Sequence, residues 1–480
     1  MFRAHFVKGL AAFGVGFVIV LLFALHPSVN AYHTGFAGLF VSAIFLTAVV
    51  AGATVRRIYV LAALLLLAFV EPEVKVTNTL QFIIVSNGLL IGAGTAWLLD
   101  KPRLATSSMP ILAGLGGMAV MTIVFPAAIG SVEWIHIHDA LMFGKYGLVA
   151  VLAFSLINQR FWWIAGALAS GSLAVAAVSI AQAFHMPWFD RWMYEVYFAS
   201  RNIPAEEVVR LSEGYFRSFG VAGPVGSALL LVMSLGMWFV LVVRSRTTAQ
   251  VAMSSLGMNV ILLAMYLTGS RLGIVVAVPV MALGVVWWQG AGSQRRQAWG
   301  YSVAAVFVLL VALGSIALND SFRQTAATST TRYVTTIPNL LRGTPDPSIA
   351  QRLAEFAGVD LRHLVMTGER DTGSTSEYVV LLKRYGLAGF LLAWQIWLMI
   401  TLRTARAAIR AESARERNAG MLALVVGITL IIGAIGTGSF FDPTRMTVLL
   451  ILVGLTPALG PYAVSLPVRS RAERVRELAT

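Results

Sequence analysis

The chain has 480 residues, of which 58% are hydrophobic and only 12% charged, and its formal net charge is +14. Soluble domains carry about 25% charged residues, so this composition excludes a soluble globular protein and indicates an all-α polytopic membrane protein. The chain contains no cysteine, which excludes a disulfide framework and thiol chemistry. No segment has the form of a nucleic-acid-binding module, so we expect no nucleic-acid partner and attribute much of the positive charge to membrane topology.

Fourteen apolar windows approach the roughly 20 residues that a helix needs to cross a bilayer. They lie near 9–25, 35–53, 58–71, 78–98, 105–129, 141–158, 161–184, 221–243, 250–268, 272–290, 300–318, 379–402, 419–437 and 446–465. The third window is short and could be re-entrant, so we predict 12–14 transmembrane helices. The first window has no small-x-small cleavage site after Leu25, which predicts an uncleaved first span.

Lysine and arginine in the short connections predict the orientation of the chain. With both termini in the cytoplasm, 20 of the 36 basic residues lie on the cytoplasmic side, and the outer loops 26–34 and 131–140 contain none. Ten of the other 16 lie in two long outer loops, 185–220 and 319–376. Long loops are exempt from the rule, so these arginines need another explanation, and anion binding is the obvious one.

This topology divides the chain into five parts. They are the N-terminal transmembrane helices (1–184), a first long periplasmic loop (185–220), transmembrane helices with a Ser-Arg element (221–318), a large periplasmic loop over an active site (319–378), and the C-terminal transmembrane helices with a basic cytoplasmic tail (379–480). Both long loops are expected to contain short amphipathic helices, one over 204–213 and one from Asp346-Pro347 to about Val365. We expect the site to face outward, away from the cytoplasm.

Three shorter patterns along the chain could bind a metal ion or an anion. His136 and His138 form a His-x-His pattern with acidic neighbours, and we favour an interfacial loop with solvated side chains over a metal site. Arg217 precedes Gly223-Pro224, a helix start that exposes backbone N–H groups to an anion. Arg271 lies between two apolar runs with hardly any loop, where a substrate phosphate or carboxylate would serve as its partner.

Four elements in this order resemble the superfamily of O-antigen polymerases and ligases (Wzy/WaaL), over roughly 210–460. They are Arg217-Ser-Phe-Gly220 running into Gly223-Pro224, then Ser270-Arg271-Leu-Gly273, then Tyr378 to Gly389 after a large loop, and finally Phe441-Asp442-Pro443. The resemblance implies a GT-C-like membrane glycosyltransferase that takes its glycan from undecaprenyl diphosphate. Ligases of this family usually carry a His-Asn-like pair before the Tyr. Here Thr375-Ser376-Glu377 stands there, which resembles the polymerases.

The resemblance also implies roles for particular residues. Arg217 and Arg271 are expected to stabilise the departing diphosphate, and Glu377 to act as the general base that activates the acceptor hydroxyl. The other residues expected to bind substrate are Arg352, Arg370, Arg332, Tyr378, Ser270 and Asp371. Glu377 and Asp371 could instead pair with Arg370 or Arg384, an alternative that we favour for Asp371 and weigh equally for Glu377. No Asp-x-Asp motif appears in the loops, so we expect neither a metal nor another cofactor.

The leading prediction is therefore a polysaccharide polymerase that joins a growing glycan to a lipid-linked repeat unit, with a chain-length regulator as a further candidate partner. An O-antigen ligase, which needs a different acceptor such as lipid A core, is the first alternative. A transporter or lipid flippase is the second, although such proteins usually show related halves and broken helices near the midplane. We find no repeat between the halves and expect the charges to cluster outside the membrane rather than within spans.

Overall fold

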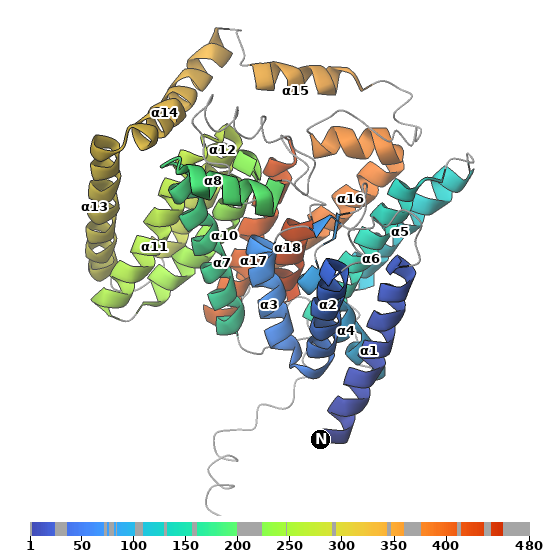
Figure 1. Ribbon diagram of the computed structural model, residues 1–480. Coiled ribbons are helices and arrows are strands. Elements are labelled where there is room, and N and C mark those ends of the chain that lie inside the picture. The colour runs from blue at the N-terminus through green and yellow to red at the C-terminus, as the bar shows by residue number, and fades with distance from the viewer. Residues whose placement is uncertain are drawn as a thin grey trace, which may run out of the picture.

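The computed structural model describes fifteen stretches of the chain, and the structural statements below refer to them. They are 2–24, 36–71, 74–75, 81–82, 84–100, 109–128, 132–155, 161–198, 223–245, 247–289, 294–342, 347–359, 376–409, 414–435 and 443–454. Nearly all of these residues are helical, which confirms the predicted all-α class (Figure 1). The described strands are β1 (Val74–Lys75) and β2 (Gln81–Phe82), an antiparallel pair in which Val74 lies opposite Phe82.

The helices follow the order of the predicted windows. They are α1 (Phe2–Ala24), α2 (Phe36–Thr54), α3 (Arg57–Val70), α4 (Ile84–Asp100), α5 (Met109–Ala128), α6 (Trp134–Phe154), α7 (Phe161–Gln182), α8 (Pro187–Met193), the π-helix η3 (Tyr194–Phe198), α10 (Gly223–Arg244), α11 (Thr248–Leu267), α12 (Arg271–Gln289), α13 (Gln294–Leu318), α14 (Asp320–Leu341), α15 (Pro347–Ala357), α16 (Glu377–Ile409), α17 (Ala414–Gly433) and α18 (Pro443–Gly454). Each of the fourteen windows falls on a helix. Six helices within the described residues are long and apolar enough to cross a membrane, and eight further apolar helices are shorter.

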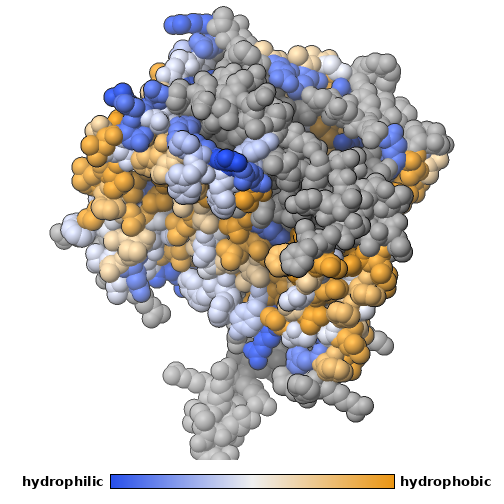
Figure 2. All heavy atoms as spheres, in the orientation of Figure 1, coloured by the Kyte–Doolittle hydropathy of each residue, from blue (hydrophilic) through white to orange (hydrophobic). Residues whose placement is uncertain are grey.

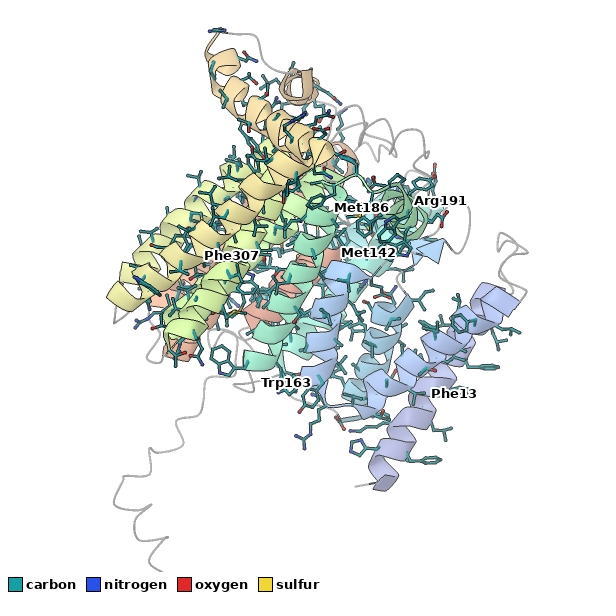
Figure 3. All side chains as sticks on the ribbon, turned by 60° about the vertical axis from the view of Figure 1, so that its left-hand side comes forward. Phe13, Met142, Trp163, Met186, Arg191 and Phe307 are labelled. Atoms are coloured by element: carbon teal, nitrogen blue, oxygen red, sulfur yellow. The ribbon has the colours of Figure 1, made fainter. Side chains whose placement is uncertain are left out.

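The outer faces of several helices are hydrophobic, as a protein embedded in lipid requires. In the stretch Gln297–Leu318 of α13 only 11% of the residues are buried, although it is the most apolar of the six long helices. Figure 2 shows wide hydrophobic areas on the visible face, and Figure 3 marks two of the exposed rings, Phe13 on α1 and Phe307 on α13. A soluble protein rarely exposes such continuous apolar surface, so the structure supports a membrane-embedded protein.

Helix α10 forms the centre of the bundle, because most of its side chains are buried against neighbours on all sides. It packs against α7, α11, α12 and α17. Two glycines of α12 set one of these contacts: Gly273 faces Ala228 and Gly284 faces Phe239, with the same offset in sequence. The two helices therefore run parallel and begin at the same end of the bundle, at Gly223-Pro224 and at Ser270-Arg271.

Helix α16 does not form the single straight span that the sequence predicts over 379–402. At Gly386 the backbone takes φ 63° and ψ −171°, a conformation that essentially only glycine adopts. The ring of Tyr378 stacks on that of Trp394, with centroids 5.8 Å apart, whereas sixteen residues of straight helix span about 24 Å. The segment 377–385, here called the short arm, therefore folds back along the segment 387–409, the long arm.

Replacing Gly386 by alanine is expected to destabilise the protein by about 1–3 kcal/mol, the usual cost of a side chain in such a backbone conformation. Gly166→Ala is the matched control. Gly166 lies in α7 with open space where a Cβ would be, so alanine there should leave stability unchanged or raise it by up to about 1 kcal/mol. The chain has 12 tryptophans, and their emission during heating in detergent measures both effects. Equal melting temperatures for the two variants would contradict the strained reversal.

The polar segment before α16 is more helical than the sequence predicts. The residues after Asn319 were predicted to begin the large outer loop, but α14 occupies this stretch, and the Asn319 side chain accepts a hydrogen bond from the Phe322 N–H at 2.8 Å. That bond caps the helix and explains why it begins there. The second expected helix, through about Val365, already ends at Ala357 and is followed by Gly358. Helices α14 and α15 lie at the top of the molecule in Figure 1.

Candidate functional site

Five of the nine predicted site residues have described side chains: Ser270, Arg271, Arg332, Glu377 and Tyr378. Arg352 lies on α15, and only its backbone is described. Arg217, Arg370 and Asp371 lie outside the described residues, as does the predicted helix over 204–213. The site is therefore built below from the five that remain and from the residues that contact them.

The turn between α11 and α12 places Arg271 at the first position of a capped helix. Gly269 takes φ 59°, a left-handed conformation that suits glycine in so tight a turn. The Ser270 hydroxyl accepts a hydrogen bond from the Gly273 N–H at 3.2 Å, and the Thr268 hydroxyl accepts one from the Ser270 N–H at 3.3 Å. Ser270 therefore caps α12 and is buried, a structural role for a residue predicted to bind substrate.

Arg271 and Arg332 hold each other through the backbone. The Arg271 Nε donates to the Arg332 carbonyl at 3.3 Å, and the Arg332 Nε donates to the Gly269 carbonyl at 3.2 Å. Arg332 belongs to α14, so the long polar helix is bonded directly to the Ser-Arg turn. The sequence predicted that Arg271 needs a partner and proposed a substrate anion. The structure supplies a protein carbonyl for one of its nitrogens and brings a second arginine beside it.

Two tyrosines also hold α14 in place. The Tyr266 hydroxyl donates to the Ala326 carbonyl at 2.9 Å, and the Tyr333 hydroxyl donates to the Tyr266 carbonyl at 3.0 Å. His185, three residues after the end of α7, also contacts α14, because its Nε2 lies 3.3 Å from the Thr325 hydroxyl oxygen. Helix α14 is thus a fixed polar cover over the ends of α7 and α11 and the start of α12.

Glu377 lies inside the bundle, although the sequence placed it in the large outer loop. It is the first residue of α16, only 7% exposed, and its N–H donates to the Ala434 carbonyl at 2.9 Å. Ala434 follows the end of α17, and the Ser376 hydroxyl donates to the same carbonyl at 3.3 Å. Folding back of the short arm brings Glu377 here, which a loop interpretation of its sequence could not anticipate.

Tyr378 is held by an aromatic cluster rather than presented to a substrate. Its hydroxyl donates to the Ile431 carbonyl at 2.5 Å, and its ring contacts those of Phe390, Trp394 and Trp397. The tyrosine therefore anchors the short arm against α17 and the long arm. Its predicted role in binding substrate stays a prediction, and what the contacts support is that it positions Glu377.

The bend of α16 carries a polar cluster that the sequence analysis missed. The Arg384 Nη1 lies 2.9 Å from the Asp139 Oδ2, and the Tyr385 hydroxyl donates to the same oxygen at 2.5 Å. The expectation of an interfacial loop with solvated side chains at 133–139 is wrong, because α6 already begins at Trp134 and His136 is buried within it. A usable signal was present: Lys383 and Arg384 stand inside an apolar window and need a partner there.

Helix contacts place this cluster at the same end of the bundle as the arginine pair. Helices α3 and α7 run parallel, since Tyr59 contacts Trp163 near both starts and Phe69 lies against Gly171 farther along. Helix α3 begins where α6 ends, because the Arg57 Nη1 donates to the Ser155 hydroxyl at 3.4 Å. The end of α7 therefore lies at the start of α6.

That shared end carries α14 on one side and the bend of α16 on the other. His185 after α7 reaches α14, and Asp139 near the start of α6 holds Arg384 beside the bend. Helix α12 packs against α17, and α10 packs against both. Arg271 and Arg332 are bonded at the start of α12, and the Glu377 N–H is bonded to Ala434 after α17, a helix that packs against α12. Another buried cation, Arg445, lies in the first turn of α18 and was not singled out in the sequence.

Asp139→Asn is expected to lower the free energy of unfolding by about 2–3 kcal/mol, between the values for surface and fully buried ion pairs. Arg384 would then be left at the bend with a neutral partner in place of its carboxylate. The matched control is Asp320→Asn, which breaks the exposed Asp320–Arg323 pair and should cost less than about 1 kcal/mol. Denaturation followed by tryptophan emission compares them. A loss as small as that of the control would contradict the structural importance of the cluster.

Within the described residues, no group of three or more His, Asp or Glu side chains is arranged to hold a metal ion. No protein family, curated protein or solved structure matches this chain. The chemistry of the site therefore has to be argued from its own residues.

Proposed function

We propose that the protein is a membrane glycosyltransferase that polymerises lipid-linked glycan at the outer face of the bacterial inner membrane. The observation that carries this proposal is Glu377, a carboxylate buried at a helix start inside an apolar bundle. A buried acid at such a position is costly and usually functional. The first turn of a helix also favours a negative charge, so this position favours the ionised form in which a carboxylate can act as a base.

The reaction needs a base and a group that stabilises the leaving diphosphate. The acceptor hydroxyl oxygen forms a bond to the anomeric carbon, its proton passes to the Glu377 carboxylate, and the bond from that carbon to the diphosphate oxygen breaks. The electron pair leaves with undecaprenyl diphosphate, which becomes more negative. Arginines are suited to that charge because they can bind two phosphate oxygens at once. Arg271 and Arg332, which are bonded where α14 meets the start of α12, are the described cations that support this role. Arg217, Arg352 and Arg370 remain predicted contributors.

The polar cover over an apolar bundle suits a substrate with two parts. Undecaprenyl is a hydrocarbon chain that stays in the bilayer, whereas the sugar and the diphosphate need polar surroundings. Helix α14 presents hydroxyls and arginines above helices whose sides are apolar. Positioning both reactants under such a cover lowers the entropic cost of bringing them together. A lipid flippase also handles such substrates, but it gives no reason for a buried acid at the start of α16.

Purified protein supplied with undecaprenyl-diphosphate-linked repeat units tests the proposal. A polymerase should produce a ladder of lipid-linked glycans with no other acceptor present. Product that appears only after lipid A core is added would identify a ligase instead. If neither addition yields product while vesicles show movement of the lipid across the bilayer, the protein is a flippase. A chain-length regulator, if one binds, should change the length of the ladder and not its appearance.

A further inference from the structure

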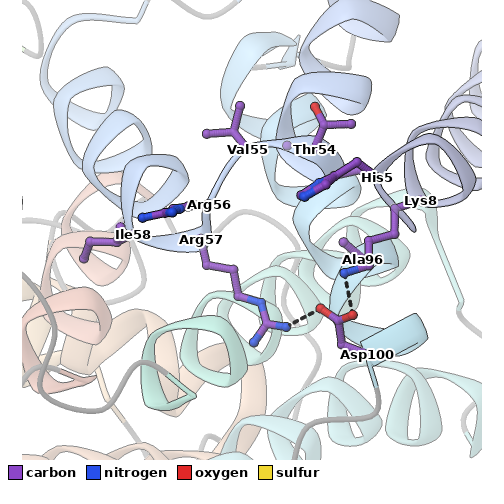
Figure 4. A pocket seen from close by; sticks show the side chains of 11 residues that line it. His5, Lys8, Thr54, Val55, Arg56, Arg57, Ile58, Ala96 and Asp100 are labelled. Carbon is purple, nitrogen blue, oxygen red and sulfur yellow. Dashed lines mark hydrogen bonds and ion pairs between the residues drawn. The ribbon is translucent and has the colours of Figure 1, made fainter. Parts of the chain in front are cut away.

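A pocket of about 350 Å³ lies where the first, second, third and fourth helices meet (Figure 4). Its polar residues are His5 and Lys8 from α1, Arg56 and Arg57 at the connection between α2 and α3, and Asp100 at the end of α4. The pocket lies near the amino terminus, which Figure 1 marks at the bottom, while α14 and α15 lie at the top. It is therefore separate from the proposed transfer site.

The charges in this pocket are unequal. Asp100 is the single acid, and it already pairs with two cations: Lys8 Nζ lies 2.5 Å from its Oδ1 and Arg57 Nη2 lies 2.7 Å from its Oδ2. Arg56 adds a third permanent positive charge. One carboxylate cannot balance these groups, so the pocket attracts an anion.

Arg56 is placed to meet such an anion. It is exposed, its backbone is extended, and it directly precedes α3 without its side chain capping that helix. Its carbonyl receives the Tyr59 N–H at 2.9 Å, so the first turn is formed. An anion beside Arg56 would then face both the guanidinium and the positive end of the α3 dipole.

The surroundings of the pocket indicate which anion it takes. Helix α1, which contributes His5 and Lys8 to the pocket, also carries large and exposed apolar side chains in the same turns: Phe6 is 62% exposed and Leu10 is 61% exposed. A free phosphate ion would gain nothing from the apolar surface of α1, whereas a phospholipid would place its acyl chains against it. The short connections on this side also carry the basic residues that predict a cytoplasmic leaflet, which is rich in anionic lipid.

We propose that the pocket binds the phosphate of an anionic phospholipid, with Arg56 as the principal contact and with Lys8 and Arg57 adding to the positive field. The bound lipid would join α1 to the connection before α3. Among the described helices, α1 contacts α2 and α4 most extensively, so this link would strengthen its attachment to the bundle. The inference is independent of the glycosyltransferase proposal, because it uses no residue of the transfer site.

The test compares lipids on the purified full-length chain in neutral detergent. Phosphatidylglycerol should raise the melting temperature of the wild type, whereas the same concentration of phosphatidylcholine should raise it much less. Arg56→Gln should weaken the apparent affinity for phosphatidylglycerol about tenfold or more, the loss expected for one charged hydrogen bond. Arg56→Lys keeps the charge and should retain most of the response. Arg323→Gln makes the same change of charge on exposed α14 and serves as the matched control.

Each outcome decides the question. A specific site is supported if phosphatidylglycerol protects the wild type and Arg323→Gln but not Arg56→Gln. Equal protection of all three proteins would overturn it and indicate a general effect of anionic lipid. Equal protection by inorganic phosphate would overturn the lipid assignment and leave a site for soluble phosphate. Melting of each variant without added lipid shows that it is folded, and native mass spectrometry of the bound lipid gives a second measure that does not depend on stability.

Discussion

Glu377→Gln is expected to lower the rate of glycan transfer by about 10²–10⁴-fold, the usual contribution of a general base. The amide has nearly the same shape as the carboxylate but cannot accept the acceptor's proton. The hydrogen bond from its backbone N–H to the Ala434 carbonyl is kept in the variant, and the melting temperature of the variant shows whether it is folded. Initial rates of ladder formation on lipid-linked repeat units measure the effect.

A matched carboxylate shows whether the loss belongs to this position. Glu195 is an exposed acid on η3 that pairs with Arg191, so Glu195→Gln should keep full activity. The pair of variants also separates two interpretations that the sequence left open. If Glu377 serves only as an ion-pair partner, its amide variant should melt at a clearly lower temperature and lose activity in proportion. Full activity in a folded Glu377→Gln protein would remove the base assignment.

The sequence predicted the class of this protein well, because lipid imposes a simple rule on composition. Each apolar window near 20 residues appears as a helix, and the basic connection before α3 lies beside the end of α4 at the pocket near the amino terminus. Such features depend on local composition, which a single sequence contains. They require no knowledge of which helices touch.

The site was harder to predict because it depends on contacts between distant segments. The reversal at Gly386 is the clearest case: nothing in an apolar stretch that contains one more glycine distinguishes a bend from a straight span. Once the short arm folds back, Glu377 moves from an outer loop to a buried helix start, and Asp139 becomes the partner of Arg384. Asp139 also shows that a His-x-His-Asp string can be the first turns of a helix.

The arginine pair was predicted only in part. The sequence singled out Arg271, but it did not predict the protein groups that contact it. Arg271 was predicted to need a partner because it lies so near the hydrocarbon, and Arg332 was predicted separately to bind substrate from the large outer loop. The structure joins them through two backbone carbonyls. A structural role therefore exists for both, and the proposed role in catalysis has to be tested against it.

Arg271→Ala is expected to reduce transfer by about 10²–10³-fold, the usual loss when one group that stabilises developing charge is removed. Arg271→Lys should recover only part of that activity, since an ammonium cannot reproduce the two parallel hydrogen bonds of a guanidinium to phosphate. Both variants also lose the bond to the Arg332 carbonyl, which is worth about 1–3 kcal/mol. Transfer rates and melting temperatures, measured on the same preparations, separate the two effects.

The control for the structural share is Tyr333→Phe. It removes the hydrogen bond from α14 to the Tyr266 carbonyl and leaves both arginines in place, so it should lower the melting temperature by a similar amount. If Arg271 served only to hold α14 in place, the Tyr333→Phe and Arg271→Ala proteins would lose activity equally. Because Arg271 is proposed to meet the leaving diphosphate, its alanine variant should lose far more. An Arg271→Ala protein with full turnover would exclude that role and leave the arginine as a tie between α12 and α14.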